Sequence, residues 1–194
     1  MKNRETISNN KSGKLKNSVL VSLFSAIIAV CSLIAIPLGS VPLTMQTLGI
    51  FCALLLLGGK RGTLSILLYI FIGIVGLPVF SGFGGGIGHL LNITGGYIVG
   101  FIFTGLVYCV FTKIFGEKTL SKTVALALGL AVCYLFGTLW YVLMYTDIGF
   151  ISGLKQAFAV CVLPFIIPDT AKLFLSVALC KAVIRRFPQG NSSL

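Results

Sequence analysis

Leu163-Pro-Phe-Ile-Ile-Pro-Asp-Thr-Ala-Lys172 is the stretch from which the rest of the chain can be interpreted. It places the carboxylate of Asp169 three residues before the ammonium of Lys172, inside the last long apolar segment. A charge at the centre of a bilayer costs about 3 kcal/mol even on lenient insertion scales. Residues three apart share one face of a helix, so the two side chains can pair or bind one polar ligand together. We favour a ligand role over a simple neutralising ion pair, because ionisable groups inside membranes commonly serve a function.

Pro168 directly precedes the aspartate and leaves two geometries open. It has no backbone N–H and a fixed φ, so it can begin a helix, which would place Asp169 in the first turn, near the positive end of the helix dipole. It can also lie within a longer helix and free the carbonyl of Pro164. The choice determines how deep Lys172 lies in the membrane.

The composition is typical of an integral membrane protein. Of the 194 residues, 57% are hydrophobic and 10% are charged, and the mean hydropathy is +1.04, which excludes a soluble fold. The net charge of +11 does not indicate nucleic-acid binding, because the basic residues alternate with apolar spans. Apart from Lys155 and Lys172, they fall in four clusters: Lys2 to Lys16, Lys60 and Arg61, Lys113 to Lys122, and Lys181 to Arg186.

The positive-inside rule places these clusters, and with them both termini, in the cytoplasm, so the number of crossings is even. We predict an all-α integral membrane protein with six transmembrane helices. Residues 1–17 form a basic cytoplasmic N-terminus, residues 18–186 a single six-helix membrane domain and residues 187–194 a cytoplasmic tail. The expected spans are 18–36, 48–58, 63–77, one that begins at Thr94, 123–145, and one that begins at Pro164 or Pro168 and ends near Arg186; the second and third are short for a bilayer.

The outer connections carry most of the unusual residues. We expect segment 37–47, with its prolines and interleaved polar groups, to fold back over a pocket, and segment 147–162 to have helical amphipathicity. The glycine-rich segment 76–92 is not interpreted as a phosphate loop, because no strand precedes it. It contains His89, the only histidine, which we interpret as a solvated loop residue. No metal site is predicted, and the six scattered cysteines are interpreted as small packing residues.

Four ordered motifs resemble the BioY family, the biotin-binding S components of energy-coupling factor (ECF) transporters. They are Pro42-Leu-Thr-Met-Gln-Thr47, Gly76-Leu-Pro-Val-Phe80 with the glycine run after it, Thr94-Gly-Gly-Tyr97, and the stretch quoted at the outset. The resemblance extends from about Ser22 to Arg186. Two positions depart from the family pattern: Ile93 stands where proline is usual, and Pro168 where glycine is common.

The resemblance implies an S-component-like fold in a prokaryotic plasma membrane and high-affinity capture of biotin from the outside. It also implies partners, namely a transmembrane coupling subunit and two cytoplasmic ATPase subunits. The chain itself is not expected to be an enzyme or to hold a cofactor, and G-x-x-x-x-G-K-[ST] does not occur in it. ATP hydrolysis would therefore belong to other chains.

Biotin offers a ureido group, a thioether ring and a carboxylate on an apolar tail. Asp169 can accept hydrogen bonds from the ureido N–H groups, and Lys172 can meet a carboxylate or carbonyl; the sequence does not tell which end they bind. For Tyr97, Trp140 and Tyr141, the alternative to ligand contact is that these side chains anchor their helices at the membrane interface. The further expected binding residues are Thr44, Gln46 and Asn92 as polar groups, Phe80, Tyr97, Trp140 and Tyr141 as walls, and Thr94, Gly95 and Gly96 of the third motif.

The first span carries small residues at four-residue spacing, among them Ser22 and Ala26. Such a stripe lets another helix approach closely. The resemblance implies docking of the coupling subunit there, whereas packing against the protein's own helices is the alternative.

Three other functions are alternatives to biotin capture by an S component. An intramembrane enzyme with Asp169 and Lys172 as acid and base lacks supporting catalytic motifs. A stand-alone secondary transporter or channel lacks an evident inverted repeat. The third is an S component for another vitamin.

Overall fold

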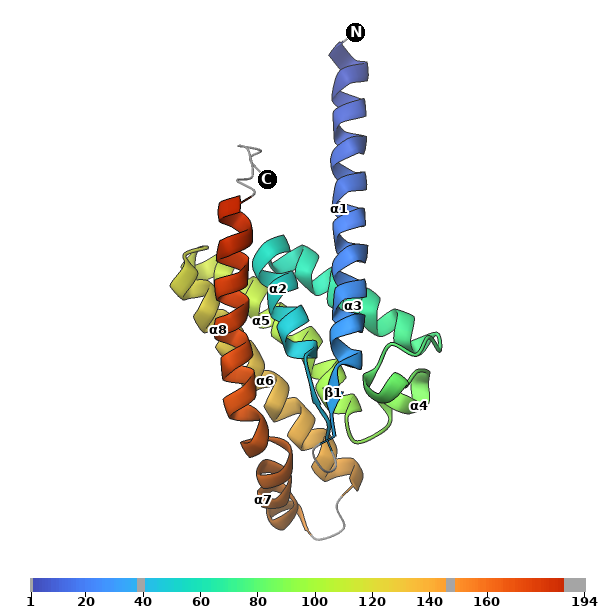
Figure 1. Ribbon diagram of the computed structural model, residues 1–194, viewed down its shortest axis with the longest axis vertical. Helices are drawn as coiled ribbons and strands as arrows, with labels where there is room; N and C mark the ends of the chain where they lie inside the picture. The colour runs from blue at the N-terminus through green and yellow to red at the C-terminus, as the bar shows by residue number, and fades with distance from the viewer. Residues whose placement is uncertain (1, 38–40, 146–148, 187–194) are drawn as a thin grey trace.

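The computed structural model describes residues 2–37, 41–145 and 149–186, and most of them are helical (Figure 1). Two short strands, β1 (Ala35–Ile36) and β2 (Leu43–Thr44), pair antiparallel with Ala35 opposite Thr44. The helices are α1 (Lys2–Leu33), α2 (Gln46–Leu57), α3 (Gly59–Ile74), the 3₁₀ turn η1 (Ser81–Phe83), α4 (Ile87–Leu90), α5 (Gly95–Phe115), α6 (Thr119–Tyr145), α7 (Phe150–Cys161) and α8 (Leu163–Arg186).

Within the described residues, four helical segments are long and apolar enough to cross a membrane: residues Gly13–Leu33 of α1, and the whole of α5, α6 and α8. Helices α2 and α3 have 12 and 16 residues. At about 1.5 Å per residue both are shorter than the roughly 30 Å hydrocarbon core, as their sequences predict. The outer faces of the long helices are apolar, with Val30, Leu135 and Phe174 at least 60% exposed. This pattern is typical of a multi-pass membrane protein.

The two ends of the molecule differ in character. Helix α1 begins and α8 ends at the same end, and the α2–α3 and α5–α6 turns lie toward it (Figure 1). The strand pair, α4 and α7 lie toward the opposite end. The basic clusters that the structure describes therefore gather at one end of the molecule.

Helices α5 and α6 form a tightly packed antiparallel pair, and glycines allow the close approach. A Cβ added to Gly100 would lie 2.8 Å from Sγ of Cys133, and one added to Gly129 would lie 3.0 Å from the carbonyl oxygen of Thr104. Gly96 lies one turn before Gly100 and faces Trp140 in the same way. The predicted start of this span at Thr94 is confirmed, with Thr94 in the N-cap position of α5.

Buried apolar side chains form two clusters. The larger one joins α1, α2, α3, α5, α6 and α8, and Ile28, Leu54 and Leu126 are among its fully buried members. The smaller one lies where α6, α7 and α8 meet the segment before β2, and it consists of Val41, Tyr141, Val142, Ala157, Cys161 and Phe165.

Helix α7 contributes to the smaller cluster through one face. It buries Gly153, Ala157 and Cys161 at four-residue spacing and leaves Ile151 and Phe158 exposed. The amphipathicity predicted for this connection is confirmed within the described residues; its first residue, Asp147, lies outside them, as do residues 38–40 and the tail 187–194.

The sequence left open whether Pro168 begins the last helix or lies within it. Helix α8 begins at Leu163, so Pro168 lies inside it and Asp169 is beyond the first turn, where the helix dipole no longer acts strongly. Other sequence-based expectations need correction. The chain turns at Gly58 alone, because α3 already begins at Gly59, and α1 extends back to Lys2. His89 lies in α4 and is half-buried, rather than solvated in a loop.

Candidate functional site

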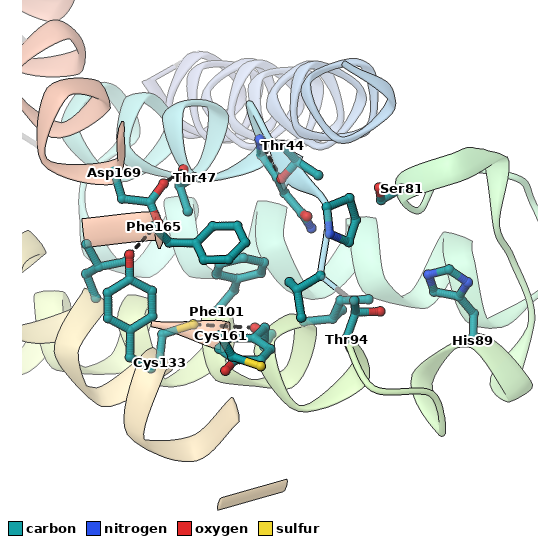
Figure 2. A pocket seen from close by; sticks show the side chains of 17 residues that line it. Thr44, Thr47, Ser81, His89, Thr94, Phe101, Cys133, Cys161, Phe165 and Asp169 are labelled. Carbon is teal, nitrogen blue, oxygen red and sulfur yellow. Dashed lines mark hydrogen bonds between the residues drawn. The ribbon is translucent and has the colours of Figure 1, made fainter. Parts of the chain in front are cut away.

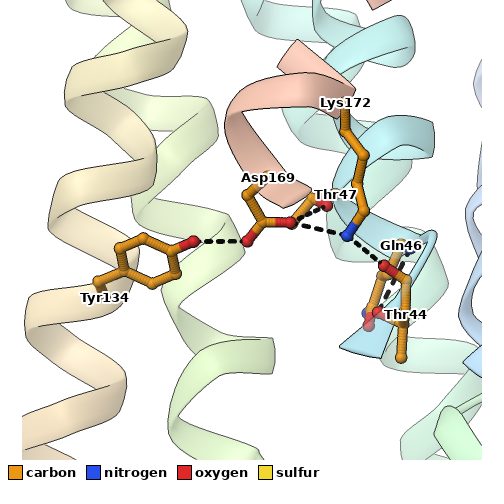
Figure 3. Close-up of polar contacts among 6 residues, drawn as sticks. All are labelled: Thr44, Gln46, Thr47, Tyr134, Asp169 and Lys172. Atoms are coloured by element: carbon orange, nitrogen blue, oxygen red, sulfur yellow. Dashed lines mark hydrogen bonds and ion pairs between the residues drawn. The ribbon is translucent and has the colours of Figure 1, made fainter. Parts of the chain in front are cut away.

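An ion pair between Asp169 and Lys172 lies in the interior of the helical assembly. The two side chains belong to residues only 3% and 6% exposed, and Nζ of Lys172 lies 2.7 Å from Oδ1 of Asp169. Nζ also donates to the backbone carbonyl of Thr44 at 2.6 Å (Figure 3). The spacing of three residues allows pairing or a shared ligand, and in this structure the two side chains pair; Lys172 binds the strand β2 as well.

The carboxylate of Asp169 joins α8 to two further helices. Its Oδ1 accepts a hydrogen bond from the hydroxyl of Thr47 in α2 at 2.9 Å, and its Oδ2 accepts one from the hydroxyl of Tyr134 in α6 at 2.6 Å (Figure 3). A carboxylate has about four acceptor positions and an ammonium has three donors. One acceptor position on Oδ2 and one N–H of Lys172 remain beyond these bonds, and the pair carries no net charge.

Gln46 lies beside this pair and anchors the start of α2 to α3. Its Nε2 donates to the hydroxyl of Tyr69 at 3.0 Å, and that hydroxyl donates to the carbonyl of Val79 at 3.3 Å. The hydroxyl of Ser32 also donates to Val79. These bonds fix the β1–β2 segment against the connection that follows α3.

A cavity opens next to the Asp169 carboxylate. The space between its lining side chains is about 630 Å³, a volume that includes open solvent at the mouth. Asp169 and Thr47 lie at one end, and Ser81 and His89 lie at the other (Figure 2). Apolar side chains form most of the wall between the ends, among them Val41, Pro42, Ile98, Phe101, Leu130 and Phe165.

Five of the residues proposed from the sequence line this cavity: Thr44, Gln46, Thr94, Tyr97 and Asp169. Lys172 lies directly behind Asp169 through the ion pair. The described residues 41–47 of segment 37–47 therefore border the pocket, as expected, with Val41 and Pro42 in the wall.

The other proposed residues support the cavity from outside its wall. Phe80 is fully buried, with its ring centroid 5.6 Å from that of Tyr69, and Tyr141 belongs to the smaller apolar cluster. The indole Nε1 of Trp140 donates to the carbonyl of Asn92 at 3.3 Å, which holds the loop before α5. Gly95 and Gly96 allow close packing, since an added Cβ would meet the Leu90 carbonyl and the Trp140 side chain.

The most important residues that the sequence-based site lacks are Tyr134 and Thr47, which hold the carboxylate. Tyr134 is a hydroxyl-bearing residue in the middle of an apolar span, and Thr47 ends the Pro42–Thr47 motif, so both carried a signal. Phe101, Cys133, Cys161 and Phe165 look like ordinary membrane-helix residues, and only the packing of four helices brings them together. The remaining lining residues not proposed from the sequence are Val41, Pro42, Ser81, His89, Ile98 and Leu130.

Two polar side chains in the wall are unsatisfied. Nε2 of His89 and the hydroxyl of Tyr97 are both buried without a hydrogen-bond partner in the described part of the chain. Burial lowers the pKa of His89 below its ordinary value. Within the described ranges, no group of three or more His, Cys, Asp or Glu side chains could hold a metal ion.

The chain is similar to known proteins over most of its length. The sequence model of the BioY family matches residues 2–189. A probable biotin transporter BioY from Pyrococcus horikoshii is 38% identical over 179 residues, which cover 92% of this chain and 99% of that protein. The biotin transporter BioY of Thermotoga maritima is 34% identical over 85% of this chain and 94% of its own length.

A solved structure is similar as well. The crystal structure of the S-component for biotin from an ECF-type ABC transporter superposes with a TM-score of 0.78 at 27% sequence identity. The match covers 92% of this chain and 94% of that one.

Proposed function

Because the chain belongs to the BioY family and is a substrate-binding subunit for biotin uptake, we propose that biotin binds in the cavity beside Asp169. As a transport subunit, the chain is not an enzyme. The observation that carries the proposal is the neutral Asp169–Lys172 pair at the end of an apolar cavity, with one acceptor position of the carboxylate left over. A cavity that is mostly apolar with a few oriented polar groups suits an amphipathic ligand such as biotin.

The charge of the pair favours one orientation of the ligand. Lys172 is already neutralised by Asp169, so a biotin carboxylate placed there would be a second buried anion without a cation. The ureido group is neutral and has two N–H donors, one of which can take the free position on Oδ2. We therefore propose that the ureido ring lies against Asp169 and that the acyl tail extends toward Ser81 and His89.

The apolar walls suit the rest of the molecule. Phe101 and Phe165 face the cavity between its two ends, and the Tyr97 ring lies beside them. Burying the thioether ring and the tail against these side chains would contribute roughly 25 cal/mol per Å² of apolar surface removed from water. The hydroxyl of Tyr97 interacts with Thr138 and Cys161 but makes no well-formed hydrogen bond in the described structure, so it can turn to donate to a bound ligand.

The proposed topology is six crossings with both termini in the cytoplasm of a prokaryotic cell. The joint position of the α1 start and the α8 end supports it, and so do the basic residues near these ends and near the α2–α3 and α5–α6 turns. Helices α2 and α3 would be the two short crossings, shielded by the longer helices. The cavity would then lie toward the outer side, where biotin arrives.

The proposed partners are a transmembrane coupling subunit and two cytoplasmic ATPases. Ser22 and Ala26 are exposed on α1, whereas Ser25 points into the protein and is 1% exposed. The protein's own helices thus leave the Ser22–Ala26 face uncovered, so a helix of the coupling subunit can approach it.

Equilibrium titration of the purified protein with biotin tests the function. We expect saturable binding of biotin, and we expect that thiamine and riboflavin do not compete with it. Competition by another vitamin with higher affinity would instead assign the chain to that ligand. Uptake by vesicles that contain this chain alone would indicate transport without the ATPase subunits.

A further inference from the structure

His89 has an unusual environment for the only histidine of the chain. Its ring stacks on Phe80 with centroids 5.2 Å apart, and Nε2 is enclosed without a hydrogen-bond partner among the described residues. Gly84 lies against Nδ1, where an added Cβ would come within 2.2 Å. Only a residue without a side chain fits there, so Gly84 lets the imidazole pack closely between the 81–86 connection and Phe80.

His89 and Ser81 line the end of the cavity opposite Asp169 (Figure 2). An imidazole and a hydroxyl are both able to donate hydrogen bonds to an anion. Neither side chain has a hydrogen bond to the protein in the part of the chain that the structure describes, so neither donor is committed to a protein partner.

His89 is also the one side chain in the described wall that can become a cation. The other titratable groups facing the cavity are Tyr97 of α5, Cys133 and Tyr134 of α6, Cys161 of α7 and Asp169 of α8, while Tyr69 of α3 is separated from the imidazole by Phe80. None of these is positively charged, and Lys172 is bound to Asp169 and Thr44. An anionic group at the far end has no other charged partner in this wall.

We infer that His89 and Ser81 form a carboxylate subsite, in which His89 takes up a proton as the carboxylate of the ligand binds. The inference rests on the proposed function, because the ureido group of biotin at Asp169 directs the carboxylate to this end. It adds an electrostatic contribution to affinity that an uncharged analogue cannot obtain.

The sign of the resulting pH dependence follows from the two states of the imidazole. Burial keeps the pKa of His89 below about 6.5 in the free protein, and a bound carboxylate raises it. Between these two pKa values binding takes up a proton, so affinity for biotin rises as pH falls, by at most about tenfold per pH unit. Above the pKa of the complex, affinity is constant.

The test is calorimetric titration of the detergent-purified full chain with biotin and with biotin amide, whose carboxamide is neutral, between pH 5.5 and 8. We expect affinity for biotin to increase at least threefold toward low pH, with net proton uptake measured in two buffers of different ionisation enthalpy. Biotin amide should bind with the same affinity at each pH, and so should biotin to His89→Gln.

Equal pH profiles for biotin and its amide on the wild-type protein would overturn the inference, and this comparison requires no variant to fold. A pH dependence that persists in a folded His89→Gln variant would overturn it as well. Binding of biotin at pH 8 with either result leaves the proposed function intact, whereas no binding of biotin at any pH refutes both.

Discussion

The carboxylate of Asp169 forms an ion pair with Lys172 and accepts hydrogen bonds from Thr47 and Tyr134. The ion pair matters most for stability. Because both charges are buried, removing one leaves the other uncompensated. We expect Lys172→Met to lose about 3–5 kcal/mol of unfolding free energy. The double variant Asp169→Asn with Lys172→Met should be more stable than Lys172→Met alone, because no buried charge remains.

Thermal unfolding in detergent measures this difference. A Lys172→Met variant as stable as the wild type would show that the pair is hydrated rather than buried.

Tyr134 is expected to tune affinity through the carboxylate it holds. Tyr134→Phe keeps the ring in the cavity wall but removes the 2.6 Å hydrogen bond to Oδ2. The bond exists before the ligand binds, so its loss reaches affinity only through the orientation of the carboxylate, and we expect biotin to bind roughly tenfold more weakly. Tyr108→Phe is the matched control, since the Tyr108 hydroxyl is buried without a partner in the described residues. Equal biotin affinities of the two variants would contradict the role of Tyr134.

Helix α8 shows what the sequence could and could not predict at the level of an element. The i, i+3 spacing predicted that Asp169 and Lys172 share one face of the helix, because that spacing has the same consequence in any helix. The helix start was undecided, because Pro168 is compatible with both a first turn and an interior position. The structure resolves this through contacts distant in sequence: Phe165 packs with Val41 and Tyr141, which holds the turn before Pro168 in the helix.

The α5–α6 pair gives a prediction about packing. Gly100→Ala would bring a Cβ to 2.8 Å from Sγ of Cys133 and 3.1 Å from its backbone carbonyl oxygen, so the helices would have to separate. We expect a loss of about 1–3 kcal/mol of stability, which is typical of overpacking. Gly13→Ala is the control, because no atom lies within 4 Å of its added Cβ. If thermal unfolding finds both variants equally stable, the close helix contact is absent.

At the scale of the whole molecule, the alternation of basic and apolar segments predicted a multi-pass helical protein, and this is confirmed. Of the site, the sequence contained the charged pair and the polar groups of the Pro42–Thr47 motif. It did not reveal that Trp140 and Phe80 lie outside the cavity wall. Trp140 lies on α6, where the direction a side chain faces depends on the packing of the whole bundle, and Phe80 lies in the connection after α3, whose path depends on contacts distant in sequence.

The exposed face of α1 leads to a prediction about assembly. Ala26→Trp should prevent close approach of a helix of the coupling subunit and reduce co-purification of the ATPase complex, while leaving biotin affinity unchanged. Ala178→Trp, on the exposed side of α8, is the control for a bulky side chain on the lipid-facing surface. Undiminished co-purification with Ala26→Trp would refute docking at this face.

The central claim is that the Asp169 carboxylate binds biotin within the cavity. The most direct test is the equilibrium affinity of purified Asp169→Asn for biotin, compared with the wild type and with Thr170→Asn, which changes an exposed neighbour on the same helix. We predict saturable binding by the wild type and Thr170→Asn, and at least tenfold weaker binding by folded Asp169→Asn. Equal affinity of all three proteins, or no binding by the wild type, would contradict the claim.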